Sequence, residues 1–319
     1  MTLKRMGGNV LSDLKALSPD LVRHLARSIH LTPVFAQVLS TTLLLPIKKH
    51  TITNMSSPTV VLVTGANSGI GYEIVKSFYE APKSYHVIMT SRSLENGTKA
   101  MEKIKSEVPS SSNTLQVVQM DLTSDESINA AFATVQSTNQ RIDALINNAG
   151  ATFDIQYSAG EVSLRDCFNQ AYDVNVTGTT IATHTFLPLL LRSADPRLLF
   201  LAGLSQITEA AKSYFPTPTQ PAGWPKPPVG FETIGYRCSK TALNMLMLDW
   251  NHKLRADGVR VWAVGPGMLA TNLGGKPELV AALNLPHPRK GGRLMRAVVE
   301  GERDGDAGQV ISYDGRMPL

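Results

Sequence analysis

Residues 64–71 read TGANSGIG, directly after an apolar β-branched run at 59–63. Beyond them Ile74, Val75 and Phe78 recur at helical spacing. The segment therefore predicts a strand, a tight glycine turn and a helix. Glycine lets a backbone turn sharply and approach a bound group closely, and a helix N-terminus presents free N–H groups and a positive dipole. This combination predicts a site for a dinucleotide pyrophosphate.

The chain beyond residue 58 repeats this alternation of short apolar runs and helix-length segments, which is typical of a parallel sheet covered on both faces. The runs predict seven strands, at 59–63, 85–90, 115–120, 143–147, 197–202, 259–264 and 309–312. Right-handed crossovers between them give an α/β fold with a doubly wound, seven-stranded parallel sheet of the Rossmann type. We expect one such domain, at 58–319.

Residues 1–57 lack this alternation, and we predict an N-terminal extension there. The extension carries seven basic and two acidic side chains, which account for the whole net charge of +5. Residues 58–319 therefore carry no net positive charge, and they offer no excess of Lys and Arg that would bind nucleic acid. The apolar stretch LTPVFAQVLSTTLLLPI is too short and too polar to span a membrane. The extension reads as a disordered tail, or alternatively as an organelle-targeting presequence within residues 1–54.

The chain has two cysteines, Cys167 and Cys238, which have neither disulfide-framework nor metal-ligand spacing. We therefore expect a reducing, cytoplasmic location and no bound metal.

Arg92 stands 21 residues beyond Gly71, at the end of the second predicted strand. An acidic residue about 20 residues beyond the glycine turn would hydrogen-bond the ribose hydroxyls of NAD, whereas an arginine pairs with the 2′-phosphate of NADP. The sequence therefore favours NADP(H) as cofactor. The alternative is a solvated surface arginine.

The string YRCSK places Tyr236 and Lys240 four residues apart, on one face at the head of an apolar-periodic helix. A phenol has an ordinary pKa near 10, and a neighbouring ammonium and a cationic ring would lower the pKa. Tyr236 is therefore a candidate acid or base. The pair alone would more often be an ordinary helix face.

Together, TGANSGIG, NNAG at 147–150, DVNVTG at 173–178, YRCSK at 236–240 and PGMLAT at 266–271 resemble the short-chain dehydrogenase/reductase family, in the family's order. The resemblance covers nearly all of residues 58–319. It implies that Tyr236 donates a proton to a substrate carbonyl. It also implies that Lys240 lowers the pKa of Tyr236 and holds the nicotinamide ribose, and that Asn175 completes the proton relay.

The same resemblance assigns further residues to the cofactor. Asp121 would touch adenine, Asn148 the adenosine half, and Leu269 with Thr271 the nicotinamide carboxamide. The remaining predicted cofactor contacts lie in the glycine turn: Gly65, Ser68, Ile70 and Gly71. For Asn148 the alternative is a structural role in bracing the central sheet.

The chain departs from the family at the fifth strand, which the family closes with a catalytic serine. The direct register puts Gly203 at that position, and Ser205 follows two residues later. We predict that a shift in the loop brings Ser205 into the site. The alternative is a loop-capping hydroxyl, in which case Tyr236 and backbone N–H groups would polarise the carbonyl.

A long, proline-rich segment between Ser205 and Tyr236 is a second departure, because it is much longer than the family usually has. Carbonyl reductases of the same family also carry an insertion there, so the segment resembles theirs. It is expected to form an ordered flap whose aromatic side chains wall a pocket for a bulky or aromatic ketone. These side chains are Tyr214, Phe215, Trp224 and Phe231. A surface loop packed on its own side chains is the alternative. A third departure, Gly265 before Pro266 in place of the usual asparagine, affects nothing central.

These observations predict an NADPH-dependent ketone or aldehyde reductase, or alcohol dehydrogenase, acting on small molecules that include those of secondary metabolism. Its partners would be a small carbonyl or alcohol substrate, with no nucleic acid and no membrane span, and the chain would be a monomer or homodimer. Two alternatives remain: an NADPH-binding sensor or scaffold, and a non-redox lyase or isomerase on the same fold.

Overall fold

The computed structural model describes residues 57–203, 205–214, 217–227, 229, 232–273 and 284–318. Residues Ser57–Leu319 form one compact unit. The predicted extension at 1–57 lies outside the described residues, except for its last residue.

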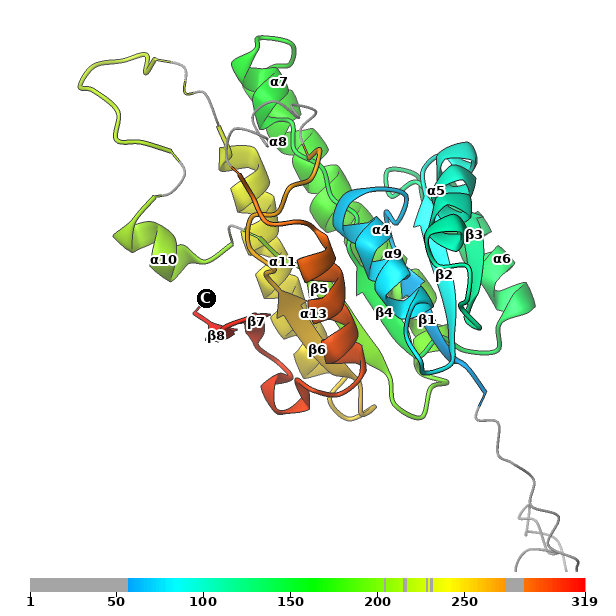
Figure 1. The fold of residues 1–319 in the computed structure, drawn as a ribbon. Coiled ribbons are helices and arrows are strands. Elements are labelled where there is room, and N and C mark those ends of the chain that lie inside the picture. Colours follow the sequence, from blue (N-terminus) through cyan, green and yellow to red (C-terminus); the bar gives the residue numbers. More distant parts are fainter. Residues whose placement is uncertain are drawn as a thin grey trace, which may run out of the picture. The chain divides into compact units, whose positions relative to one another are not determined.

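One eight-stranded sheet organises this unit, in the order β3-β2-β1-β4-β5-β6-β7-β8 (Figure 1). The strands are β1 (Thr59–Val63), β2 (Tyr85–Ser91), β3 (Thr114–Gln119), β4 (Ala144–Asn147), β5 (Arg197–Leu201), β6 (Arg260–Val264), β7 (Val310–Ser312) and β8 (Gly315–Met317). Strands β1 to β7 are parallel, as predicted, whereas β8 pairs antiparallel with β7. The seven-strand prediction missed β8, because three residues after a turn carry no β-branched run.

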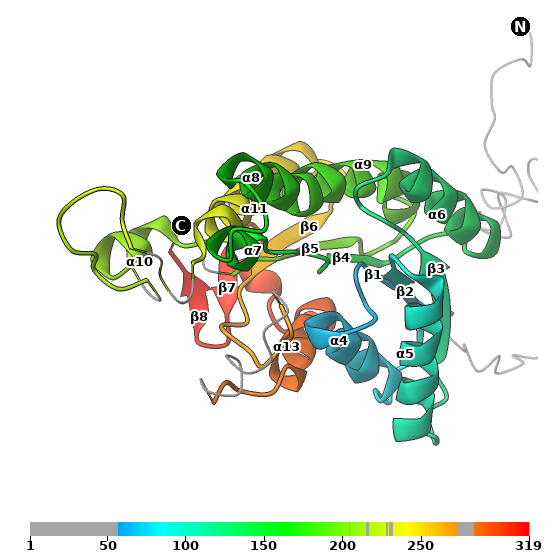
Figure 2. The ribbon, with the colours of Figure 1, turned by 90° about the horizontal axis from the view of Figure 1, so that it is seen from above.

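Helices cover both faces of the sheet (Figure 2). One face carries α4 (Gly69–Tyr79), α5 (Leu94–Glu107) and α13 (Arg289–Val299). The other carries α6 (Asp125–Thr138), α8 (Leu164–Tyr172), α9 (Thr179–Leu190) and α11 (Ile234–Lys253). The shorter helices are α7 (Asp154–Ser158), α10 (Ile207–Lys212), a π-helix η1 (Asp173–Gly178) and a 3-10 turn η2 (Asp304–Asp306). This is the doubly wound arrangement that the alternating sequence pattern predicts.

The strands contribute side chains to two separate hydrophobic cores, because successive side chains of a strand point to opposite faces of the sheet. In β1, Val60 and Leu62 pack in the core beneath α6, α9 and α11. Val61 and Val63 pack in the core beneath α4, α5 and α13. A strand buried on both faces reads as a continuous apolar run, which explains why TVVLV shows no polar alternation.

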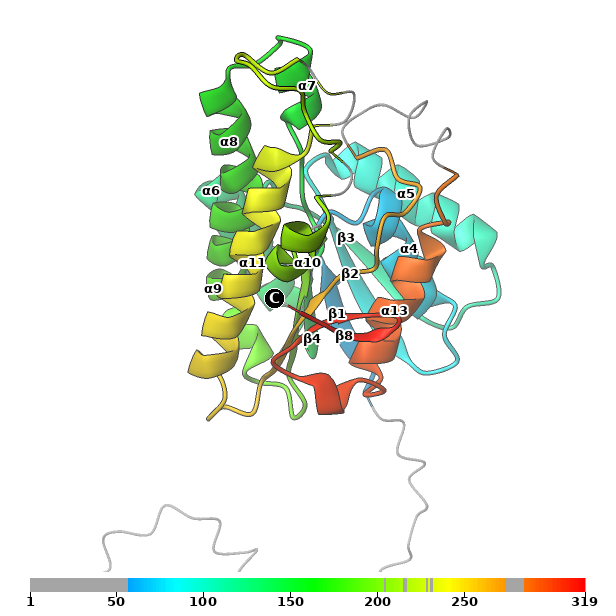
Figure 3. The same cartoon turned by 90° about the vertical axis from the view of Figure 1, so that its left-hand side faces the viewer.

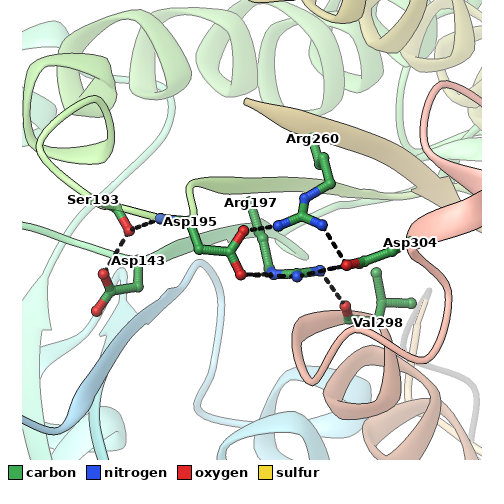
Figure 4. A network of polar contacts seen from close by, with 7 residues as sticks. All are labelled: Asp143, Ser193, Asp195, Arg197, Arg260, Val298 and Asp304. Atoms are coloured by element: carbon green, nitrogen blue, oxygen red, sulfur yellow. Dashed lines mark hydrogen bonds and ion pairs between the residues drawn. The ribbon is translucent and has the colours of Figure 1, made fainter. Parts of the chain in front are cut away.

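A network of ion pairs closes the amino ends of β5 and β6 (Figure 4). Arg197 is 4% exposed and pairs with Asp195 at 2.9 Å and with Asp304 at 2.6 Å. Arg260 contacts the same two carboxylates. The network therefore stabilises the end of the sheet that lies opposite the carboxyl ends of these two strands.

Candidate functional site

The glycine turn after β1 has the backbone that its sequence predicts. Gly65 and Gly69 have φ of 61° and 56°, a region that favours glycine. A Cβ on Gly65 would lie 2.8 Å from Cα of Ala149, and one on Gly71 would collide with the carbonyl oxygen of Gly65. The turn therefore forms a close-packed cradle at the N-terminus of α4, and this cradle fits a pyrophosphate.

Two polar residues predicted at the adenosine half have structural partners. The amide nitrogen of Asn148 donates to the carbonyl oxygens of Thr64 at 2.8 Å and Gly65 at 3.0 Å. Asp121 accepts hydrogen bonds from the backbone N–H and the hydroxyl of Thr123. Asn148 thus braces the glycine turn, and Asp121 stabilises the turn that precedes α6.

Arg92 is exposed and directly follows β2. A cavity of about 530 Å³ extends along the glycine turn, and Arg92 is not among the residues that line it. Its lining includes Ser68, Thr271 and two α5 lysines, Lys99 and Lys103. Sequence analysis missed these lysines because each has a glutamate four residues away, a pattern that is typical of a solvated helix face.

Two of the three predicted relay residues, Lys240 and Asn175, meet at Gly150, and Tyr236 lies near Lys240. A Cβ on Gly150 would lie 3.0 Å from Nζ of Lys240 and 3.1 Å from Oδ1 of Asn175. Lys240 is 1% exposed, donates to the carbonyl oxygen of Leu201 at 3.0 Å and lies 5.7 Å from the ring centre of Tyr236. Burial lowers the pKa of Lys240 to about 8 and raises the pKa of Tyr236. Tyr236 is therefore a neutral phenol at neutral pH, the form that can give up a proton.

Asn175 lies within the π-helix η1, a feature often found at functional sites. Its side chain is fully buried and donates to the carbonyl oxygen of Ala151 and to the hydroxyl of Ser239, both at 2.8 Å. It also accepts from the Ala151 N–H. These bonds tie the loop after β4 to α11.

A second cavity, of about 330 Å³, lies at the carboxyl ends of β5 and β6. Apolar side chains dominate its lining, among them Ile70, Leu269 and Met317. Thr271 lines both cavities and lies 3.5 Å from the position that a Cβ on Gly69 would take. The two cavities therefore adjoin at Thr271, and Tyr236 lines the apolar one.

Gly203, and not Ser205, lines this apolar cavity. A Cβ on Gly203 would lie 3.5 Å from Oη of Tyr236. Ser205 is 1% exposed, its hydroxyl accepts a hydrogen bond from Gln206, and its carbonyl oxygen accepts from Thr241 and Asn244. The predicted loop shift is absent, because these bonds hold Ser205 against α11 and keep the direct register.

The segment before Tyr236 does not form the predicted aromatic wall with its described residues. Trp224 is 87% exposed, and Tyr214 is 44% exposed and stacks on the guanidinium of Arg237. Phe215 and Phe231 lie outside the described residues. Instead, Gln206, Glu232 and Thr233 line the cavity from this part of the chain. In Figure 3, α10 lies beside α11, near the C-terminal strand β8.

Sequence analysis missed Asp154, which is fully buried behind Tyr236. Its carboxylate accepts from the backbone N–H groups of Gly235 at 2.7 Å and Tyr236 at 2.9 Å, and from the hydroxyl of Thr152. The nearby Cys167 thiol has its pKa raised to about 12, by burial and then by the Asp154 charge. A single acidic residue 82 positions away from Tyr236 leaves no local pattern to find.

Among the described residues, no helix is long and apolar enough to cross a membrane.

Known proteins resemble this chain in sequence and in fold. A family model described as short chain dehydrogenase matches residues 59–207. The short-chain dehydrogenase/reductase tropE of Talaromyces stipitatus is 46% identical over 272 residues, which cover 82% of this chain and 98% of the relative. The short-chain dehydrogenase/reductase eupG of a Phoma species is 41% identical, over 77% of this chain and 91% of the relative.

Solved structures share the fold. An NADPH-bound carbonyl reductase from chicken fatty liver has a TM-score of 0.65 at 24% identity, covering 82% of this chain and 99% of the other. The NADP active-site complex of RhlG from Pseudomonas aeruginosa has a TM-score of 0.62 at 21% identity, covering 82% and 96%. Fold, site geometry and relatives together show that this chain belongs to the short-chain dehydrogenase/reductase family of oxidoreductases.

Proposed function

We propose that this protein is an NADPH-dependent oxidoreductase that reduces the carbonyl group of a small organic ketone or aldehyde, or oxidises the corresponding alcohol. The observation that carries the proposal is the convergence of Tyr236, Lys240 and Asn175 beside an apolar cavity that joins the glycine turn. NADPH, when bound, supplies the hydride, and the protein's own residues must supply the proton and the alignment.

The cradle formed by Gly65, Ser68, Ile70 and Gly71 would hold the pyrophosphate at the head of α4. Arg92 at the end of β2 would pair with the 2′-phosphate of NADP(H). This preference is compatible with the NADP-bound and NADPH-bound structures that share the fold. Leu269 and Thr271, where the two cavities meet, would contact the nicotinamide carboxamide.

Tyr236 acts in this proposal as the general acid that protonates the carbonyl oxygen. The buried ammonium of Lys240 favours the phenolate that remains, because an opposite charge nearby stabilises the charged form. Asn175 then links Lys240 to the loop after β4 in the proton relay. General acid catalysis by a positioned group is typically worth about 10²–10⁴ in rate.

The cavity favours an apolar substrate with few polar groups, because its lining is mainly aliphatic and Met side chains with Gln206, Glu232 and Thr233 as polar points. This substrate class includes bulky and aromatic small molecules of secondary metabolism. The fungal reductases tropE and eupG, which are similar to this chain in sequence, are compatible with such a substrate.

One observation favours a second candidate, a protein that binds NADPH as a sensor or scaffold. Position 203, where the family has its serine, is a glycine. The retained Tyr236, Lys240 and Asn175 favour the enzyme instead, because a binding module needs no proton relay.

NADPH oxidation at 340 nm tests the proposal, with hexanal, benzaldehyde, acetophenone and 9,10-phenanthrenequinone as substrates. We expect turnover that Tyr236→Phe abolishes and Tyr172→Phe, on α8, retains. Tight NADPH binding with no turnover of any of these carbonyls would favour the sensor.

The cofactor preference has its own test. Arg92→Glu should lower kcat/KM for NADPH at least tenfold while sparing NADH, since each pairing with a phosphate is a charge-assisted bond. The exposed Arg255→Glu, after α11, is the matched charge control. An unchanged NADPH preference in Arg92→Glu would exclude Arg92 as the 2′-phosphate ligand.

A further inference from the structure

Gly265 follows β6 at the apolar cavity, in the position where the family commonly has asparagine. Its φ is not in the positive region, so the backbone conformation does not require glycine there. A Cβ on Gly265 would lie 3.2 Å from Sδ of Met317, which is closer than ordinary van der Waals contact. The glycine therefore leaves a space that the Met317 side chain occupies.

The C-terminal hairpin brings Met317 to this space. In the antiparallel pair of β7 and β8, Met317 lies opposite Val310, and directly opposite residues project from the same face of a sheet. Val310 belongs to the core beneath α6, α9 and α11, and Met317 packs against that core. The preceding Arg316 donates to the carboxylate of Asp306 at 2.7 Å and so anchors β8. Met317 therefore lies on the face of the sheet that carries α11 and Tyr236.

Met317 borders the apolar cavity, as do its neighbours Gly265 and Gln206. The amide nitrogen of Gln206 donates to Sδ of Met317 at 3.8 Å. None of these three residues lines the cavity along the glycine turn, which the proposed function assigns to the cofactor. Met317 is thus placed to contact the substrate and not the cofactor phosphates.

The size of the cavity makes each lining side chain important. Its volume is about 330 Å³, at the lower end of the range of about 300–1,000 Å³ for ligand pockets. In the proposed function the nicotinamide ring takes part of this volume. The remaining space favours a carbonyl compound with one ring over a compound with a fused ring system.

We propose that Met317 is a specificity-determining residue, whose side chain fills the space beside Gly265 and limits the size of the carbonyl substrate. This inference rests on the proposed function. The favoured substrate class is a carbonyl compound that carries one ring-sized apolar group. A fused ring system meets the Met317 side chain, because a close-packed wall cannot yield without strain.

Met317→Ala removes the side chain beyond Cβ and widens the cavity. We expect the ratio of kcat/KM for 2-naphthaldehyde to kcat/KM for benzaldehyde to rise at least about tenfold, because even one methylene in an apolar pocket changes such a ratio by about 10- to 200-fold. Met317→Leu conserves the volume and should keep the ratio within about threefold of the wild type. Met245→Ala, 67% exposed on α11, is the matched control. The NADPH dissociation constant should not change.

The contact between positions 265 and 317 can also be tested without turnover. Gly265→Asn introduces a side chain into the space that Met317 occupies. It should therefore lower the Tm of the wild type by at least about 2 °C more than it lowers the Tm of Met317→Ala, in which the space is free. Equal losses of Tm in the two backgrounds would show that Met317 does not fill this space and would overturn the inference.

The outcomes distinguish this inference from the proposed function. Wild-type turnover that Tyr236→Phe abolishes, with a substrate ratio that Met317→Ala leaves unchanged, would overturn the role of Met317 alone. If Met317→Ala does not fold, Met317→Val provides the same comparison with a smaller expected rise, and an unchanged ratio would again overturn the role. A wild type that oxidises NADPH with none of the four carbonyls would overturn both.

Discussion

The buried carboxylate of Asp154 accepts a hydrogen bond of 2.9 Å from the backbone N–H of Tyr236. Asp154 begins α7, beyond the loop that follows β4, whereas Tyr236 lies in the first turn of α11. A negative charge is favourable at a helix N-terminus, where backbone N–H groups lack partners. This contact therefore sets where α11 begins and, through it, where the Tyr236 hydroxyl lies in the cavity.

Removing this carboxylate should loosen the head of α11. In Asp154→Ala two backbone N–H groups lose their acceptor, and we expect the free energy of unfolding to fall by about 2–4 kcal/mol. Asp154→Asn, which keeps one acceptor oxygen, should lose less. Urea denaturation measures both, with Asp257→Asn, exposed after α11, as control. Equal stability of Asp154→Ala and the wild type would show that the contact is not needed to hold the helix.

The glycine turn allows a matched comparison between two Gly→Ala variants. A Cβ on Gly71 would collide with the carbonyl oxygen of Gly65 and with the Asn148 amide, whereas one on Gly305 meets no atom within 4 Å. Gly71→Ala should therefore lower stability by about 2–4 kcal/mol or prevent folding, and Gly305→Ala should change it by less than about 1 kcal/mol. Thermal denaturation with and without NADPH measures this. A well-folded Gly71→Ala that binds NADPH normally would contradict the close-packed cradle.

The sequence predicted those parts of the fold that depend on local periodicity. The seven parallel strands lie within a residue or two of the predicted ranges, because β-branched runs buried on both faces are conspicuous. Tyr236 and Lys240 were recognisable together because four residues on a helix share one face. The edge strand β8 has three residues and no such run, so only its pairing with β7 identifies it.

The parts that escaped prediction depend on contacts between distant segments. Asp154 reaches Gly235 across 81 positions, and nothing local distinguishes it from other aspartates. Ser205 is only two residues from Gly203, which lines the cavity. Only its bonds to α11, through Thr241 and Asn244, show that the backbone turns it away.

The ion-pair network at the amino ends of β5 and β6 should make stability depend on acidic pH (Figure 4). The hydrogen bond from Arg197, reinforced by the charges of Arg197 and Arg260, lowers the pKa of Asp304 below its ordinary value. The unfolded chain therefore binds a proton at Asp304 before the native chain does. The contribution is complete above the ordinary pKa of about 4 and is lost as pH falls through the lower native pKa.

Asp304→Asn tests this dependence by removing the titrating group. The wild type should be more stable than the variant at pH 7, and the difference should shrink between about pH 4 and pH 2. Urea denaturation at several pH values measures it, and the exposed Glu102→Gln on α5 controls for the loss of one negative charge. A difference that is the same at pH 7 and pH 3 would contradict the role assigned to Arg197.

Lys240 should lower the free energy of unfolding of the protein, although the proposed proton relay requires it. Burial lowers the pKa of its ammonium to about 8, from an ordinary value of 10.5. Between these two values the unfolded chain holds a proton that the native chain has released, so the stability of the cofactor-free protein should rise with pH in that window. Below about pH 8 both states are protonated, and the cost of burying the charge is present in full.

Lys240→Met keeps the length of the side chain and removes this charge. At pH 7 the cofactor-free variant should be more stable than the wild type by about 1–3 kcal/mol, less the hydrogen bond that Leu201 loses. The advantage should decrease from about pH 8 to pH 10.5, while carbonyl turnover is lost at every pH. Lys253→Met, exposed on the same helix, is the matched control. A Lys240→Met protein that is less stable than the wild type at pH 7 would mean that the native fold stabilises the buried ammonium, contrary to its lowered pKa.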